Sequence, residues 1–192
     1  MPILKAIAGH GGTAGIRRYL ERGNRALARD VLNLPMEEWV CETPGEHSII
    51  VEWDVEMDRT REAYGTNAPW RGLDARTFEH FVISPDPEDG IDLDALRRLS
   101  RAWIERHFKD FEVAIVYHDD NEGRIPHAHI VVNNTNVVTG RRMHTDNPLD
   151  LNRALQEMAA ERGLRALSNE RPEPSTGFQR LAANKGEPRA KA

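Results

Sequence analysis

Alternating hydrophobic and polar positions along the chain predict a set of β-strands. Successive side chains of a strand point to opposite faces, so a half-buried strand shows a hydrophobic period of two. This pattern, or a short apolar run that ends at Gly or Pro, occurs at 3–8, 77–84, 111–118 and 127–134. A turn at Thr139-Gly140 and a further short strand are predicted within 136–143.

Other segments repeat their hydrophobic residues at a helical period of about 3.6. Helices are predicted over 13–32, 48–63, 92–108 and 149–162. Gly23-Asn24 is expected to interrupt the first of them, Asp92 to begin the third and Gly163 to end the last. The second is favoured because 52–62 is rich in Glu and Arg and lacks Gly and Pro.

Strands and helices are intermingled along the chain, and a short connection joins the strands 111–118 and 127–134. This order predicts an α+β fold, with a central antiparallel sheet and helices packed mainly on one face. With 192 residues, 39% of them hydrophobic, the chain can form one domain with a substantial core. We expect this domain to span 1–167. The polar stretch 168–192 is expected to be a tail or linker that leads into a further region.

Composition narrows the class of protein. No apolar run approaches the ~18–20 residues that cross a bilayer, so membrane insertion is not expected. Cys41 is the single cysteine, which excludes an internal disulfide and fits a reducing cytoplasm. The net charge of −5 argues against binding to nucleic acid, but residues 1–30 carry a local charge of +4.

Three histidines on two neighbouring strands predict a metal site. In 127–133, strand alternation places His127 and His129 on one face. It places Ala128, Ile130 and Val132 on the opposite, core face. His118 ends the preceding strand, and residues across an antiparallel pair lie ~4.5–5.5 Å apart. Three neutral imidazoles suit a divalent ion such as Zn, Mn, Ni, Co or Fe, and accept Mg less readily. We therefore expect one metal site on the open face of the sheet.

Such a site is expected to be catalytic because three protein ligands leave coordination positions free for water or substrate. Asp119 and Asp120 directly follow His118. Histidine ligands commonly donate their second ring N–H to a carboxylate, so either aspartate is a candidate partner of the site.

The residues around these histidines resemble a known family. HDDNEGRIPHAHIVVNN (118–134) resembles the third motif of conjugative relaxases, or mobilisation nucleases, of the HUH endonuclease superfamily. HFVISPDPED (80–89) resembles their second motif, whose serine, here Ser84, contacts DNA. The first motif carries a nucleophilic tyrosine in a helix after an N-terminal strand, and Tyr19 in GIRRYLERG takes that position. The order of motifs agrees over roughly 1–165.

The resemblance implies an HUH palm with a ferredoxin-like arrangement, and an enzyme that nicks one DNA strand at a transfer origin. Tyr19 would attack the scissile phosphate and form a 5′-phosphotyrosyl link, which is resealed after transfer. Asp119 or Asp120 would orient a ligand or accept the proton. The implied cofactor is Mn or Mg, with Zn, Ni or Co as alternatives.

The implied partners are single-stranded origin DNA, relaxosome accessory proteins and the coupling protein of a type IV secretion system, in a bacterial cytoplasm. The DNA contacts expected are the arginines that flank Tyr19, the serine of the second motif and, more weakly, one arginine before it: Arg17, Arg18, Arg22, Arg25, Ser84 and Arg76.

Several alternatives remain open at this stage. Tyr64, at a helix end beside a Gly-containing loop, is a second candidate nucleophile, and His10 is a third, because Pro-His-Ala-His resembles a relaxase class with a histidine nucleophile. A three-histidine hydrolase of a small molecule and a non-catalytic DNA-binding accessory protein are the alternative functions. Other HUH enzymes carry their tyrosine after the histidine pair, and no tyrosine follows His129.

Overall fold

The computed structural model describes residues 2–34, 40–42, 52–69, 72–145 and 147–165. Its described strands form one antiparallel sheet in the order β1-β4-β6-β5-β2-β3. In that order the strands are β1 (Ile3–His10), β4 (Arg76–Ser84), β6 (His127–Asn136), β5 (Phe111–His118), β2 (Ala28–Leu32) and β3 (Val40–Glu42). The expected tail, 168–192, lies outside the described residues, as do 48–51 of the expected second helix.

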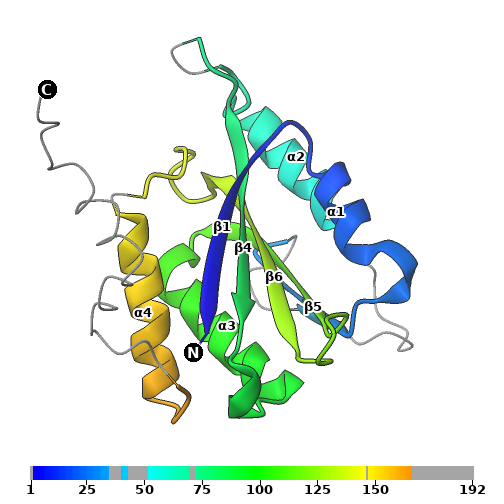
Figure 1. The fold of residues 1–192 in the computed structure, drawn as a ribbon. Helices are drawn as coiled ribbons and strands as arrows, with labels where there is room; N and C mark the ends of the chain where they lie inside the picture. Colours follow the sequence, from blue (N-terminus) through cyan, green and yellow to red (C-terminus); the bar gives the residue numbers. More distant parts are fainter. Residues whose placement is uncertain (1, 35–39, 43–51, 70–71, 146, 166–192) are drawn as a thin grey trace, which may run out of the picture.

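Helices cover both faces of the sheet (Figure 1). They are α1 (Ala14–Glu21), α2 (Trp53–Ala63), α3 (Leu93–Phe108) and α4 (Pro148–Ala160), with short 3₁₀ turns at η1 (Arg22–Asn24) and η2 (Pro87–Asp89). The α+β class and the antiparallel sheet are confirmed. The expectation that the helices lie mainly on one face is corrected: α3 and α4 pack on one face, and α1 and α2 on the other.

The central strand β5 explains this two-sided arrangement, because it is apolar on both faces. Val113 and Ile115 join the core beneath α3 and α4, whereas Ala114 and Val116 join the core beneath α1 and α2. A strand that is buried on both faces requires a layer of helices on each side. Trp103 of the larger core also donates its indole N–H to the Leu151 carbonyl at 3.0 Å and so links α3 to α4.

The prediction of a helix over 13–32 is wrong in its second half. The helical segment stops at η1, where Gly23 has a positive φ of 71°, and 28–32 forms β2. The hydrophobic pattern does not reveal this strand, because the charged Asp30 takes a core position. Its side chain faces the larger core and is fully buried. It is tolerated there because Arg97 donates to both of its oxygens and the Tyr117 hydroxyl donates to Oδ2 at 2.9 Å. The strand β3 was not predicted either.

The other elements match the sequence patterns within a few residues. The Asp92 side chain accepts the Ala95 N–H at 2.7 Å and caps α3, as expected for an N-terminal aspartate. Gly163 adopts a φ of 72° just after α4, in agreement with its expected role as a terminator. A bridge between Thr135 and Arg142 forms the turn predicted within 136–143. None of the described helices combines the length and the apolar character needed to cross a membrane.

A buried polar network fixes α2 over β5 and β6. The Arg61 side chain is 1% exposed and donates to Asn133 Oδ1 at 2.7 Å. Asn133 in turn donates to Glu112 Oε2 at 2.5 Å, and the Thr60 hydroxyl donates to Glu112 Oε1 at 2.6 Å. Burial raises the pKa of Glu112 despite these hydrogen bonds. The network therefore holds the covering helix in register with the sheet.

The raised pKa of Glu112 predicts a pH-dependent contribution to stability. The folded state retains the proton more strongly than the unfolded chain, whose pKa is near the ordinary 4.5. The contribution is therefore fully present below that value and is lost as the pH rises through the folded pKa. We expect Glu112→Gln to gain unfolding free energy relative to the wild type between pH 5 and pH 8, measured by urea denaturation. A difference that is constant with pH would contradict this assignment.

Candidate metal centre

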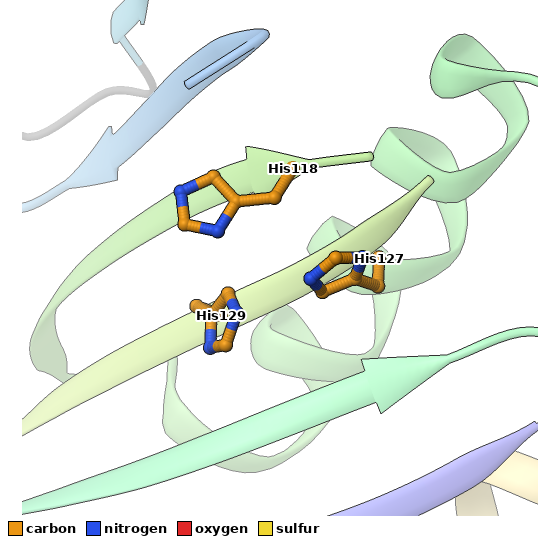
Figure 2. Close-up of side chains that lie close together, drawn as sticks. All are labelled: His118, His127 and His129. Atoms are coloured by element: carbon orange, nitrogen blue, oxygen red, sulfur yellow. The ribbon is translucent and has the colours of Figure 1, made fainter. Parts of the chain in front are cut away.

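His118, His127 and His129 come together at one end of the sheet (Figure 2). His118 is the last residue of β5 and pairs in register with His127, the first residue of β6. One ligand nitrogen from each ring lies within 4.8 Å of the other two. Metal–nitrogen bonds of about 2.0–2.1 Å place ligands up to about 4 Å apart, so small ring rotations complete the site. The predicted triad is thus brought together by the fold.

The face that carries the triad is less open than expected. His118 is fully buried and His127 is 9% exposed. The His118 Nε2–H donates to the backbone carbonyl of Leu20 at 2.8 Å, so the last turn of α1 lies against the site. The other ring nitrogen, Nδ1, is buried and has no partner among the described residues. A buried nitrogen with a free lone pair is the group that a metal ion satisfies.

In His127 and His129, too, one ring nitrogen has a protein partner. His127 Nδ1 lies 3.2 Å from the Ile125 carbonyl, which leaves Nε2 for a metal. His129 Nδ1 lies 3.0 Å from Nε2 of a fourth histidine, His80. The Ile125 carbonyl can only accept, so it fixes the tautomer of His127, whereas His80 orients the ring of His129.

His80 is a member of the site that the sequence analysis missed. It lies on β4, and its ring stacks on that of His129 with 5.2 Å between centroids. Alternation along 77–84 places His80 on the same face as Ser84. Only the pairing of β4 with β6, however, shows that this face adjoins the triad.

Burial favours the neutral form of three imidazoles, those of His80, His118 and His129. It lowers the pKa of His129 to about 3, and the neighbouring histidines contribute further. It also lowers the pKa of His80 to about 4, with a smaller contribution from Lys5, and it lowers the pKa of His118. Neutral nitrogen donors fit a divalent transition metal, so the donor set agrees with the predicted cofactor.

Loss of the His80 contact is expected to weaken metal binding. His80→Ala removes the group that orients His129, and loss of a hydrogen-bond partner of a metal-binding histidine typically costs about 10- to 100-fold in metal affinity. Calorimetric titration with Mn²⁺ measures the effect. His10→Ala is the matched control, because His10 is an exposed histidine at the other end of the sheet. Equal affinities of His80→Ala and the wild type would show that His80 does not orient the ligand.

Tyr19 lies on the side of the site formed by α1. It is 57% exposed and precedes Leu20, whose carbonyl binds His118. The Arg25 guanidinium lies over the tyrosine ring, 4.8 Å from its centroid, and pairs with Asp120 at 3.0 Å. The predicted nucleophile is therefore accessible from solvent, on the helix whose backbone contacts His118.

Tyr64 and His10 lie at the opposite end of the sheet. The Tyr64 hydroxyl donates to the carbonyl of Val137, just beyond the last residue of β6, whereas the metal ligand His127 is the first residue of that strand. His10 ends β1 opposite Arg76, and its Nδ1 lies 3.0 Å from the Ala75 carbonyl. Neither alternative nucleophile adjoins the triad.

A family model identifies the class of protein. The nuclease domain of MobA/VirD2-like relaxases matches residues 37–164, two thirds of the chain, including the triad and Ser84. The chain belongs to this relaxase family. Tyr19 lies before the matched range, so the family match does not test its predicted role.

Solved structures share the fold of this relaxase at low sequence identity. The MobM relaxase domain, bound to Mn and to oriT DNA of plasmid pMV158, is 15% identical, with a TM-score of 0.51 over 93% of this chain and 98% of that one. A structure that addresses vancomycin resistance transfer in Staphylococcus aureus is 9% identical, with a TM-score of 0.57 over 89% of this chain and 100% of that one.

The conjugative relaxase TrwC, in a metal-free complex with oriT DNA, is 12% identical, with a TM-score of 0.51 over 88% of this chain and 73% of that one. No curated protein sequence matches the chain.

The arginines that flank Tyr19 in this relaxase differ in their availability for DNA. Arg18 and Arg22 are exposed, and neither forms an ion pair with any residue in the described part of the chain. Arg17 pairs with Asp54 and with Glu21, so it ties α1 to α2 and is not free for phosphate. The predicted contact at Arg17 is therefore not supported by its position.

The remaining predicted residues divide between the two ends of the sheet. Ser84 ends β4 on the face of the triad and is partly exposed. Arg76, at the far end, pairs with Glu79 at 3.0 Å and donates to the Met143 carbonyl. Arg76 is thus a structural residue, remote from the metal.

The two aspartates that follow His118 also differ. Asp119 pairs with Arg124 at 2.9 Å. One oxygen of Asp120 lies 3.5 Å from His127 Nε2, and the other binds Arg25. Asp120 is therefore the carboxylate that faces both the metal ligands and the arginine over Tyr19.

Proposed function

We propose that this relaxase domain cuts one DNA strand at a transfer origin by transesterification, with Tyr19 as the nucleophile. The observation that carries the proposal is the bond between His118 and the Leu20 carbonyl, because it fixes α1 and its accessible tyrosine beside the metal ligands. Membership of the relaxase family supports the reaction class.

Each group at the site has a role in this reaction. The Tyr19 oxygen attacks phosphorus, the bond from phosphorus to the 3′ oxygen breaks, and the products are a 5′-phosphotyrosyl link and a free 3′-OH. When bound, the divalent ion neutralises charge on the non-bridging phosphate oxygens. The phenol must lose its proton to become a nucleophile, and Asp120, which binds the arginine over the Tyr19 ring, is the candidate acceptor.

The reaction conserves the energy of the phosphodiester in the phosphotyrosyl bond. The free 3′-OH can therefore attack that bond in reverse and reseal the strand without a nucleotide cofactor. Arg18 and Arg22 flank the nucleophile and supply the positive charge for the DNA backbone, which the net charge of −5 otherwise disfavours. The Arg25 guanidinium packs on the face of the Tyr19 ring and holds it in place.

We further propose that the protein works in the bacterial cytoplasm, with relaxosome accessory proteins and the coupling protein of a type IV secretion system. The DNA complexes of the MobM and TrwC relaxases support DNA as the partner. The assignment of the two protein partners follows from the family alone.

A covalent adduct is the decisive test. Fluorescent single-stranded oligonucleotides, tiled across the replicon that carries the gene, are incubated with the protein and Mn²⁺ or Mg²⁺ and then run on a denaturing protein gel. We expect one oligonucleotide to give a labelled protein band that EDTA abolishes. If no strand forms an adduct with either ion, the protein is not a nicking enzyme.

A further inference from the structure

The sheet face that carries the triad extends across β4 to the edge strand β1. On this side β1 presents Ile3, Lys5 and Ile7, all of them exposed. Lys5 pairs in register with Val82 of β4, and Val82 pairs with His129 of β6. Residues paired in register share a face, so Lys5, Val82 and His129 form a row across three strands. Neighbouring strands are ~4.8 Å apart, which places the Lys5 backbone about 10 Å from that of the metal ligand.

Lys5 is the cation of this row. It forms no ion pair with any residue that the structure describes, although its charge is close enough to lower the pKa of His80. Its two neighbours on this face are apolar, with Ile3 57% exposed and Ile7 41% exposed. An exposed apolar edge with a single unpaired ammonium group lacks an evident role in the stability of the fold.

The in-line geometry of phosphoryl transfer suggests a role for the surface formed by Ile3, Lys5 and Ile7. In phosphoryl transfer the attacking and leaving oxygens lie roughly in line on opposite sides of phosphorus. Tyr19 approaches from the side of β5, because α1 is held by His118, the last residue of that strand. On the proposed function, a phosphate bound at the triad with Tyr19 in line would direct the leaving 3′ oxygen across β6 and β4, towards β1 and Lys5.

We propose that Lys5 binds a backbone phosphate on the 5′ side of the nick, on the strand that ends in the free 3′-OH after cleavage. This inference rests on the proposed function, with Tyr19 as the nucleophile. Ile3 and Ile7 would provide apolar contacts to the bases or sugars of the same strand. Lys5 would thus hold the released 3′-OH near the phosphotyrosine, where resealing requires it.

Lys5→Met tests the proposal, with Lys109→Met as the matched control, because Lys109 is an exposed lysine that follows α3 on the other face. The tiled adduct assay first locates the nick. Fluorescence anisotropy then measures the binding of two oligonucleotides, one ending in the 3′-OH at the nick and the other beginning at its 5′ side. We expect Lys5→Met to weaken binding of the first about three- to tenfold, to lower its salt slope by ~0.7 and to leave the second unchanged.

A phosphate scan identifies the contact. A neutral methylphosphonate replaces each phosphate of the first oligonucleotide in turn. At one position the replacement should weaken wild-type binding but have no further effect on Lys5→Met. If Lys5→Met and the wild type bind the first oligonucleotide equally, this inference is wrong. The proposed function still stands in that case if the wild type forms the covalent adduct. Absence of both adduct and binding in the wild type overturns both.

Discussion

Replacement of Tyr19 by phenylalanine should abolish the covalent adduct and reduce strand cleavage by at least about a thousandfold. The phenyl ring retains the stacking with Arg25 but lacks the oxygen that attacks phosphorus. DNA binding should therefore persist within a few-fold of the wild-type affinity. A denaturing gel of the labelled origin strand measures the adduct, and anisotropy measures binding.

Tyr64→Phe is the matched control, because Tyr64 is also exposed but contacts the Val137 carbonyl at the opposite end of the sheet. It should retain full adduct formation. Loss of the adduct in Tyr64→Phe, with activity retained in Tyr19→Phe, would reverse the assignment. Full activity of both variants would indicate a hydrolase that does not use a tyrosine nucleophile.

His129→Ala should eliminate tight metal binding and lower cleavage by about a hundredfold or more. His129 is the central ligand, with ring centroids 4.8 Å from His118 and 5.1 Å from His127. Its removal leaves two imidazoles and also separates His80 from the site. Calorimetry with Mn²⁺ and the adduct assay report the two losses.

The control for this variant is His144→Ala, because His144 is exposed and lies outside the triad. Thermal unfolding of the metal-free proteins checks that both variants fold. Unchanged cleavage by a folded His129→Ala protein would show that the three histidines do not form the catalytic metal site.

The sequence by itself determined most elements of the fold and the three histidines that cluster as candidate metal ligands. Side chains alternate along any strand, so the spacing of His127 and His129 places both on one face. His118 follows from local order too, because a short connection returns the next strand alongside the first. The apolar periodicity of 92–108 and its Asp92 cap likewise depend only on neighbouring residues.

The tertiary structure decided what depends on contacts between distant segments. Strand β2 exists because Arg97 and Tyr117 satisfy the buried Asp30, and no local pattern reveals those partners. Both faces of β5 are covered because α1 and α2 return to it from far away in the chain.

The surroundings of the triad also depend on contacts between segments that are distant in the sequence. His80 adjoins His129 only because β4 pairs with β6. Tyr19 and Tyr64 have similar local sequence signals, but a hydrogen bond from His118 to the Leu20 carbonyl brings α1 to the metal ligands, whereas Tyr64 packs at the opposite end of the sheet. Spacing along the chain identified the histidine triad, and strand order and helix docking determined which other residues surround it.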